Sequence, residues 1–499
     1  MNRPSGGITF VCHTTDPTSE TVAATQASVV AQSQPGVRFE IVSSLAAASD
    51  AIARADGWVG FVDPGDVLAP EAAASVRSHV DGDPLVDLVY TDETNRVGTD
   101  PRRTSFHKPG WSPDRLRCQP YTGRLTLARA EVVRDVGGLR PELASLAEHD
   151  LVLRIAERTR HVAHVPEVLC DRRPLPQPYA AFDPAHIDVA CRVLDEHLER
   201  LGIEAVARSH ATATGLLRLE PALHTRPLVS IVIPTAGARR RVRGDDVNLV
   251  VNCVQSILSR STYAEIEIVC VTDESVDDAT GRRLIELEPN RVRLVGYEGP
   301  FHFSRKVNRG ALAASGDVLL VLNDDTEVQT PGWIEAMLVY ALDPGVGAVG
   351  ARLLFEDGRI QHIGVVGVGG NPGHPYHGLS ADTVGHGANA LVPGNFLAVT
   401  GACLMTRRET FEEVGGMSSW FPANYNDLDY CLKLGNAGYR VVATPDAVLA
   451  HFESSSRSGT VATPELDLIR RRWGRLLRDD PYYSKNFPSG IADFKPARQ

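Results

Sequence analysis

A predicted buried strand in the second half of the chain ends in three polar residues that suit metal binding. The run from Val318 to Leu322 is apolar and has the length of a strand buried on both faces, and Asn323, Asp324 and Asp325 follow it directly. Open α/β sheets bind ligands just beyond the carboxyl ends of their strands. Two adjacent carboxylates repel each other unless a cation or a proton lies between them, and a hard divalent metal carrying a phosphate meets that need. On this stretch alone, an Asp-rich turn is an equal alternative.

Three more residues whose side chains could take part in binding or catalysis stand at the ends of predicted strands and helices in the same half. Asp273 follows a strand, Asp427 opens a helix, and His451 ends another strand. Asp273 could accept hydrogen bonds from a ribose or a base, Asp427 could take a proton from a hydroxyl, and His451 could bind a metal. Each has a structural alternative: a turn cap for Asp273, a helix N-cap for Asp427, and a hydrogen-bonding role for His451.

The elements that must position these residues alternate between strands and helices, which is typical of a largely parallel α/β sheet. The predicted strands cover residues 8–12, 37–42, 58–62, 85–91, 228–233, 266–271, 318–322 and 447–450. The predicted helices include residues 186–201, 247–258, 428–434 and 468–477. Residues 238–246 read as a long polar loop.

The two halves of the chain repeat one plan. The segment LTLARAEVVRDVGGL echoes CLMTRRETFEEVGGM, and EHDLVLRIAERTRHVAHVPEVL echoes NDLDYCLKLGNAGYRVVATPDAVL. Val136 matches Val414 at an offset of 278 positions, and Glu148 matches Asp427 at an offset of 279. Two matches at nearly one offset predict a duplicated domain.

The bulk composition bounds the class of protein. A chain of 499 residues with 43% hydrophobic and 23% charged residues predicts more than one globular domain. The net charge of -11 argues against nucleic-acid binding, which needs a basic face. Eight cysteines without a CxxC pair predict buried reduced thiols and a cytoplasmic protein. We find no signal-peptide pattern and no apolar run near the ~18 residues of a membrane span, which leaves room for peripheral contact at the inner face of the plasma membrane.

A series of motifs in the second half resembles a known enzyme family. The motifs are VSIVIPT, VTDES, GPFHFSRKVNRGALAASGDVLLVLNDDTEV, PGW, IQHIG, TGACLM, VGGM, NDLDYCLKLGNAGYR, HFESSSR and RWGRLLRDDPYY, which together span nearly all of Leu228 to Tyr483. In this order they resemble family 2 glycosyltransferases of the GT-A fold. More narrowly, they are similar to bacterial rhamnosyl- and galactofuranosyl-type enzymes that build O-antigens and cell-wall polysaccharides.

The resemblance implies a role for each matching residue. These are Asp427 as the catalytic base; Asp325 and His451 as metal ligands; Thr235, Asp273, Asn308, Asp324 and Arg457 as nucleotide-sugar contacts; and Gly401 and Ala402 in the acceptor loop. It also implies a divalent metal cofactor, Mn²⁺ or Mg²⁺, and an inverting transfer from a nucleotide-diphosphate sugar. The acceptor would be a saccharide or a polyprenyl-linked saccharide in cell-surface polysaccharide synthesis.

Departures from the family pattern leave the substrates open. Thr272 and Glu274 flank Asp273 where the family has other residues, His302 stands where Asn is common, and Ala236 replaces a usual Asn. These differences bear on the identity of the sugar and the base more than on activity. We expect His362, His374 and His377 to contact an acceptor or solvent rather than a metal. The acceptor, the linkage and the oligomeric state are unreadable from the sequence.

The first half is similar to the same kind of domain in the segments DLVYTDE, FHKPGWSPD and VGGLRPEL, but it lacks some residues of the family's motifs. Gly65 aligns with Asp325, and Asp171 aligns with His451, which predicts loss of the metal-nucleotide site. The acids Asp63, Asp66 and Glu148 keep open a bifunctional transferase with two active domains. A third interpretation is a non-catalytic saccharide-binding protein, which fits the first half and not the second.

We therefore expect an α/β protein with two GT-A-like, Rossmann-like domains in tandem, each a mixed sheet flanked by helices. The expected divisions are a degenerate domain at 1–175, a linker with an amphipathic helix at 176–227, a catalytic domain at 228–460 and a helical tail at 461–499.

Overall fold

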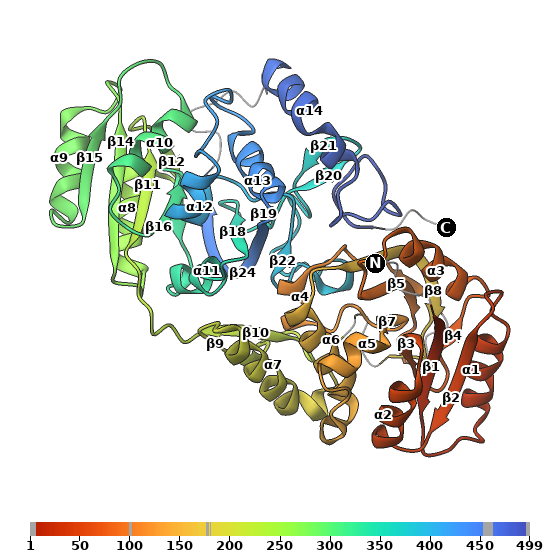
Figure 1. Cartoon of the computed structure of the whole chain (residues 1–499). Coiled ribbons are helices and arrows are strands. Elements are labelled where there is room, and N and C mark those ends of the chain that lie inside the picture. Colours follow the sequence, from red (N-terminus) through yellow and green to blue (C-terminus); the bar gives the residue numbers. More distant parts are fainter. Residues whose placement is uncertain (1–5, 99–101, 176–178, 180, 453–462, 496–499) are drawn as a thin grey trace.

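Two mixed sheets flanked by helices organise the chain in the computed structural model, which describes residues 6–98, 102–175, 179, 181–452 and 463–495 (Figure 1). The first sheet lies in the red and orange lobe and the second in the green and blue lobe. The prediction of mixed α/β sheets covered by helices is confirmed.

The first lobe holds an eight-stranded sheet in the order β2-β1-β3-β7-β5-β8-β4, with β6 paired to β5. Its strands are β1 (Gly7–His13), β2 (Val37–Val42), β3 (Gly57–Val62), β4 (Val67–Leu68), β5 (Leu88–Asn95), β6 (Thr104–Phe106), β7 (Thr126–Arg129) and β8 (Val162–Asp171). Its helices are α1 (Glu20–Val30), α2 (Leu45–Arg54), α3 (Ala72–Gly82), α4 (Pro113–Cys118), α5 (Ala130–Asp135), the 3-10 turn η1 (Pro141–Leu146) and α6 (Ala147–Arg158).

The second lobe holds a ten-stranded sheet in the order β15-β14-β11-β16-β23-β18-β24-β17, with β19 on β18 and β22 on β24. Its strands are β11 (Val229–Pro234), β14 (Ile266–Thr272), β15 (Val292–Gly296), β16 (Val318–Leu322), β17 (Thr326–Val328), β18 (Val346–Leu354), β19 (Ile360–His362), β22 (Gly394–Asn395), β23 (Cys403–Arg407) and β24 (Arg440–His451). Its helices are α8 (Leu249–Arg260), α9 (Asp278–Leu287), α10 (Phe303–Ala313), α11 (Trp333–Ala341), η3 (His386–Ala388), α12 (Arg408–Glu413), α13 (Asn426–Asn436) and α14 (Thr463–Arg478). Two hairpins complete it: β12 (Arg239–Val242) with β13 (Asp245–Asn248), and β20 (Val366–Val368) with β21 (Asn371–Gly373).

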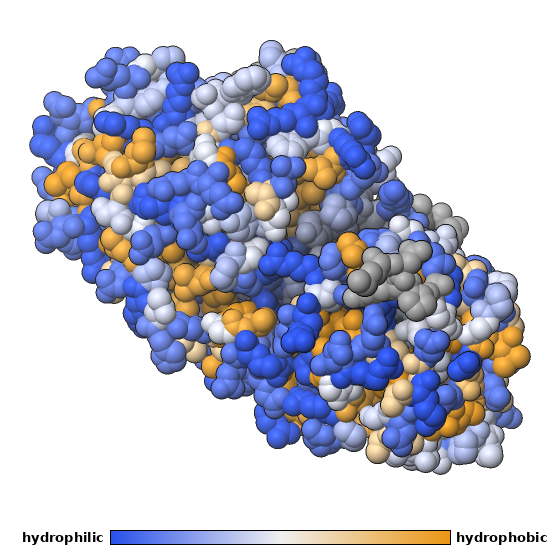
Figure 2. All heavy atoms as spheres, in the orientation of Figure 1, coloured by the Kyte–Doolittle hydropathy of each residue, from blue (hydrophilic) through white to orange (hydrophobic). Residues whose placement is uncertain are grey.

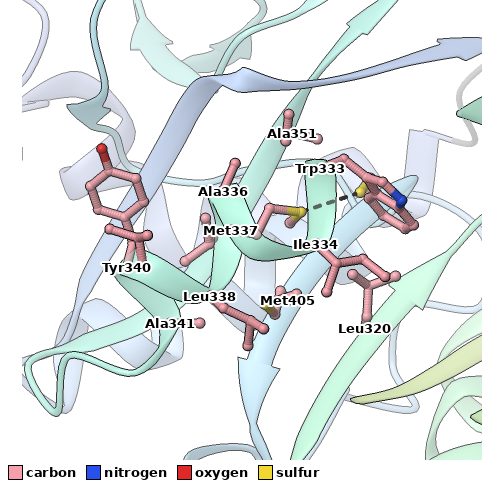
Figure 3. Close-up of a cluster of buried hydrophobic side chains, with 14 of the residues drawn as sticks. Leu320, Trp333, Ile334, Ala336, Met337, Leu338, Tyr340, Ala341, Ala351 and Met405 are labelled. Carbon is pink, nitrogen blue, oxygen red and sulfur yellow. Dashed lines mark hydrogen bonds between the residues drawn. The ribbon is translucent and has the colours of Figure 1, made fainter. Parts of the chain in front are cut away.

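Helix α11 fixes the position of the strand that carries the acidic residues. Its side chains, including Trp333, Met337 and Tyr340, are almost fully buried (Figure 3). They pack in one hydrophobic cluster with Leu320 of β16 and Met405 of β23. Because close-packed interiors resist displacement, this contact holds the end of β16 in place.

The part of the chain between the two lobes forms regular secondary structure instead of an extended linker. After the 3-10 turn η2 (Pro184–His186), α7 (Ile187–Leu201) leads into a hairpin of β9 (Ala205–Ser209) and β10 (Leu217–Pro221). Leu194 and Leu198 of α7 are buried in the same cluster as Trp333 of the second lobe. The predicted amphipathic helix therefore exists, and its apolar face joins the core of the second lobe.

The strand orders of the two sheets correspond one to one once β15 and β22 are set aside. From β2 to β4 and from β14 to β17, each neighbouring pair also has the same parallel or antiparallel sense. Trp58 pairs with Arg129 as Val318 pairs with Arg407. This agreement supports the duplication that the sequence predicts.

The strand pairing also corrects one alignment made from the sequence. Counting from the equivalent Val62 and Leu322, Val67 corresponds to Glu327 and Gly65 to Asp325. Val67 pairs with Asp171, and Glu327 pairs with Ala450. The residue in the place of His451 is therefore Arg172, one position after Asp171.

Two local predictions were wrong. The polar stretch 238–246 is not a loop throughout, because β12 and β13 pair there as a hairpin. Asp92 and Glu93 do not follow a strand but lie inside β5 with no exposed side-chain surface. The strand tolerates them because Lys108 donates to Glu93 at 2.9 Å, and His164 contacts Asp92 at 2.7 Å.

A buried ion-pair network joins the lobes. Asp114 of α4 is fully buried and accepts from Arg117 at 2.8 Å. Its other oxygen accepts from Arg440 at 2.9 Å and from Asn395 at 2.7 Å, both in the second lobe. The lobes are therefore held together by charges that have little contact with water.

The C-terminal segment is helical only in α14; residues 479–495 continue without a further helix and contact both lobes. The amide of Gly110 donates to the carbonyl of Pro481 at 2.6 Å, and the amide of Gly367 donates to Asp480 at 2.7 Å.

Hydrophilic residues predominate on the face that Figure 2 shows, with hydrophobic residues in smaller groups. Among the described helices, none is both long and apolar enough to cross a bilayer. All eight cysteines are free, and seven are buried, as predicted.

Candidate active site

The end of β16 brings an aspartate and a histidine together. Asp325 is the third residue after β16, and β17 pairs with β24 so that Thr326 lies opposite His451. The Nε2 atom of His451 is 3.0 Å from Oδ1 of Asp325, and both residues are buried. Gln361 of β19 holds the imidazole from its other side, with Oε1 2.5 Å from Nδ1. If the Nδ1 atom carries the proton, Nε2 presents its lone pair toward the carboxylate edge.

Asp324 faces the strand where the second lobe begins. The hydroxyl of Thr235, at the end of β11, donates to Oδ2 of Asp324 at 2.6 Å. Burial and the adjacent charge of Asp325 together raise the pKa of Asp324 to about 6, against the opposing hydrogen bond from Thr235. This is the like-charge strain that the sequence predicted for adjacent carboxylates, and a bound cation would relieve it.

Asp273 is ion-paired rather than free. Its carboxylate contacts Nζ of Lys306, a residue of α10 with no exposed surface. Burial opposes the charge, but hydrogen bonds from Lys306 and Ser275 lower the pKa of Asp273. Lys306 also donates to the carbonyl of Thr235 at 2.7 Å and lies 5.5 Å from the ring centre of Phe301. The lysine thus ties the end of β14 to the end of β11.

Asp427 lies at the start of α13, beside the loop that enters β23. Its Oδ2 accepts from the amide of Gly401 at 2.8 Å, and its Oδ1 accepts from Leu428 at 2.8 Å. The carbonyl of Ala402 accepts from the amide of Asn323 at 3.1 Å. A short chain of contacts therefore connects Asp427 to the acidic end of β16.

The backbone of Gly401 lies close to Asp427 and Phe303. A Cβ at this position would lie 3.4 Å from the Cβ of Asp427 and 3.4 Å from the ring of Phe303. The close approach allows the backbone amide to reach the carboxylate. The predicted acceptor residues Gly401 and Ala402 therefore contact the predicted base and the strand end, respectively.

Two predicted contacts have a different status. The side-chain amide of Asn308 donates to the carbonyl of Met417 at 2.8 Å and accepts from its amide at 3.0 Å. In this structure Asn308 anchors the Met417 loop, and its contact with a sugar nucleotide stays a prediction. Arg457 lies outside the described residues, as does the rest of the segment 453–462.

The residues around β16 fit a divalent cation whose remaining ligands come from a substrate. Among the described residues, no group of three or more His, Cys, Asp or Glu side chains forms a metal site. The Asp325 carboxylate and the His451 imidazole do lie side by side, and both are donors that Mn²⁺ accepts. Phosphate oxygens would then complete the coordination, as is usual for metal ions that bind nucleotides.

A second histidine lies behind this pair. His362 ends β19, is almost fully buried, and accepts from the amide of Thr400 at 3.2 Å. Its Nδ1 atom is 3.0 Å from Nδ1 of His374. Burial lowers the pKa of His362 well below its ordinary value, and the nearby His374 adds to this shift. His362 is therefore a neutral, buried residue. The expectation that it contacts solvent was wrong, and its contact with an acceptor stays a prediction.

The equivalent place in the first lobe holds an arginine. The segment Thr122-Gly123-Arg124 corresponds to Thr400-Gly401-Ala402, so Arg124 stands where the second lobe has Ala402. The guanidinium contacts Asp63, lies 3.4 Å from Asp66, and donates to Glu148 at 2.5 Å. Burial alone would lower the pKa of Arg124, but these three acids raise it well above the ordinary value.

Sequence reasoning missed three residues of this constellation: Lys306, Gln361 and Arg124. Lys306 stood inside a quoted motif, FSRKVNRG, without a role, and Gln361 gave no signal beyond its place before His362. The repeat carried a signal for Arg124, because TGR aligns with TGA at the offset of 278.

The chain was compared with known proteins. The family described as Glycosyl transferase family 2 matches residues 230–415. An uncharacterised protein of Sinorhizobium fredii is 34% identical over 90% of this chain and 50% of its own length. The O-antigen biosynthesis protein RfbC of Myxococcus xanthus is 35% identical over 87% of this chain and 34% of its own length. This chain thus spans half or less of these two relatives.

One further relative and one solved structure match a smaller part of this chain. The N-acetylglucosaminyl-diphospho-decaprenol L-rhamnosyltransferase of Mycobacterium tuberculosis is 26% identical over 40% of this chain and 70% of its own length. The mannosyltransferase PcManGT from Pyrobaculum calidifontis, solved with GDP-Man and Mn²⁺, covers 52% of this chain and 74% of its own, with a TM-score of 0.33 and 14% identity. This TM-score is too low to support any conclusion about the candidate active site. Residues 230–415 are therefore similar to glycosyl transferase family 2.

Proposed function

We propose that the second lobe is a metal-dependent, inverting glycosyltransferase that moves a sugar from a nucleotide-diphosphate donor to a saccharide or polyprenyl-linked acceptor. The observation that carries this proposal is the contact of Asp325 with His451, connected through Asn323 and Ala402 to Asp427. The names of the relatives support the acceptor class, since one is an O-antigen biosynthesis protein and another acts on a decaprenol-linked sugar.

Each residue then has a defined task. Asp325 and His451 hold the cation, which when bound neutralises charge on the leaving diphosphate. Thr235 and Asp324 follow two neighbouring strands, and their task in this proposal is to contact the nucleoside. Lys306 keeps Asp273 ionised and oriented toward the same side.

Asp427 takes the proton from the acceptor hydroxyl. The hydroxyl oxygen forms the new bond to the anomeric carbon while the bond to the diphosphate oxygen breaks on the opposite face, so the configuration inverts. The Gly401 amide and the Leu428 amide hold the carboxylate in position for this transfer. A positioned general base of this kind contributes about 10²–10⁴-fold to the rate.

The test uses nucleotide sugars with Mn²⁺ and a panel of saccharide and polyprenyl-diphosphate acceptors. Asp427→Asn should remove transfer and keep metal-dependent nucleotide binding, whereas Asp325→Ala should remove both. Asp278→Asn, an exposed acid in the first turn of α9, is the matched control and should behave as the unchanged chain. Full transfer by the Asp427 variant would refute the assignment.

A further inference from the structure

The first lobe contains a large cavity that the proposed transfer reaction does not use. Its volume is about 1110 Å³, which is ample for a ligand of several sugar units. His13, Ser44 and Asp63 line it, and they stand at the carboxyl ends of β1, β2 and β3. The cavity therefore occupies the same edge of its sheet as the acidic residues of the second lobe.

An internal cation already occupies the centre of the acidic cluster beside this cavity. The Arg124 guanidinium bridges Asp63 and Glu148, the residue that corresponds to Asp427. Arg172 stands in the place of His451, and its guanidinium donates to Glu93 at 2.9 Å. The acids that could have held a metal are thus neutralised by residues of the chain itself.

The charge balance of the cluster disfavours a diphosphate. Four cations, of Lys108, Arg124, Arg172 and Arg173, face four carboxylates, and each cation has at least one carboxylate partner. The carboxylates are Asp63, Asp66, Glu93 and Glu148. An anionic ligand would have to compete with these carboxylates for cations that are already paired. An uncharged ligand meets no such penalty.

Polar groups beside the cavity remain available to a neutral ligand. The side chains of Glu148 and Arg173 are 37% and 53% exposed, so each keeps hydrogen-bonding capacity outside its ion pair. Paired carboxylates and guanidiniums are held in fixed planes, which suits the adjacent hydroxyls of a sugar ring.

A histidine and two aromatic rings complete the lining. The Nε2 atom of His149 is buried and has no hydrogen-bond partner among the described residues. Burial lowers the pKa of His149 to about 3, so its imidazole is neutral and offers a donor or an acceptor to a hydroxyl. The ring of Phe182 lies 4.9 Å from it, and Phe61 contributes a second apolar face. Apolar rings next to oriented polar groups match the two surfaces of a saccharide.

We propose that the cavity of the first lobe binds an uncharged saccharide without a metal ion, with Arg124 in the place that a divalent cation takes in the second lobe. This site does not depend on the transfer reaction, and its test has a binding readout.

The experiment uses the full chain carrying Asp427→Asn, in EDTA, on an array of neutral bacterial oligosaccharides. The best ligand is then measured by calorimetry. We expect binding that is unchanged by EDTA or Mn²⁺ and weakened at least tenfold by His149→Ala or Phe182→Ala. His79→Ala, an exposed histidine of α3 that does not line the cavity, is the control and should bind as before. Hydrogen exchange should show protection of residues 141–150 on saccharide binding, which locates the site even if a variant fails to fold.

Three results would overturn the proposal. The first is an array on which no neutral oligosaccharide binds. The second is saccharide binding that requires Mn²⁺ or that persists unchanged in the His149 and Phe182 variants. The third is binding of UDP or dTDP with Mn²⁺ that survives Asp325→Ala, since this would indicate a second nucleotide site in the first lobe.

Discussion

The two lobes place corresponding residues at the same strand ends, yet an aspartate and a histidine lie together in one lobe and an arginine pairs with the acids in the other. In the second lobe, Asp325 and His451 lie 3.0 Å apart next to the small Ala402. In the first lobe, Gly65, Arg172 and Arg124 stand at these positions. The backbone plan survives because buried apolar strands maintain it, whereas the chemistry changes with three side chains.

In the first lobe, a side chain fills the position that corresponds to the candidate metal site of the second lobe. The guanidinium of Arg124 supplies the positive charge between Asp63 and Glu148 that a cation would otherwise supply. Buried carboxylates without a partner would be strongly destabilising, so the arginine stabilises the fold of the first lobe.

The sharpest test of the difference between the lobes is the product of the reaction. If only the second lobe transfers sugar, Asp427→Asn should lower turnover by about 10²–10⁴-fold and remove every linkage. Glu148→Gln should remove no linkage from the product. The measurement is the linkage pattern by NMR. One of two linkages disappearing in the Glu148 variant would establish the bifunctional alternative.

Substitutions at Arg124 and at the corresponding Ala402 should change how each lobe responds to Mn²⁺. Arg124→Ala should destabilise the protein by about 3–5 kcal/mol, because it leaves buried carboxylates unpaired, and added Mn²⁺ should restore part of that loss. The reciprocal Ala402→Arg should remove metal-dependent nucleotide binding from the second lobe. Thermal melts with and without Mn²⁺ measure both effects. An Arg124 variant whose stability ignores Mn²⁺ would contradict the idea that the arginine stands in for a cation.

The interface between the lobes should be sensitive to one buried acid. Asp114→Asn should cost about 2–4 kcal/mol, because Arg117 and Arg440 lose a charged partner. We expect denaturation to separate into two transitions, one for each lobe. Asp81→Asn removes an exposed pair with Arg77 and should cost less than about 1 kcal/mol. Equal losses in the two variants would argue against a coupling role for Asp114.

The smallest expected effect is on the pH dependence of stability. His386 accepts from the amide of His107 across the interface at 3.0 Å, and burial together with the charge of Arg115 lowers its pKa to about 3, despite the opposing charge of Asp92. The unfolded histidine binds a proton near pH 6.5 and the folded one does not. Stability is therefore complete above pH 6.5 and falls by up to about 1.4 kcal/mol per pH unit below it.

His386→Gln removes this titration and keeps a hydrogen-bond acceptor. The melting temperature of the unchanged chain should consequently fall more between pH 7.5 and pH 5.5 than that of the variant. Parallel curves would show that His386 does not contribute to acid sensitivity.

The sequence by itself determined the repeated plan, the buried strands and the polar residues at their ends. These features are local: an apolar run such as Val318 to Leu322 forms a buried strand, and the polar residues that follow it must lie at the edge of the sheet. The offset between Glu148 and Asp427 likewise needed no coordinates.

Only the tertiary structure decided which of these residues meet. Lys306 pairs with Asp273, Gln361 holds His451, and Arg124 reaches Glu148, although the partners are between 24 and 90 positions apart. Strand register decides such contacts, and a shift of one residue replaced Asp171 by Arg172 opposite the site. Side-chain direction and register depend on packing across the whole sheet, which no local pattern encodes.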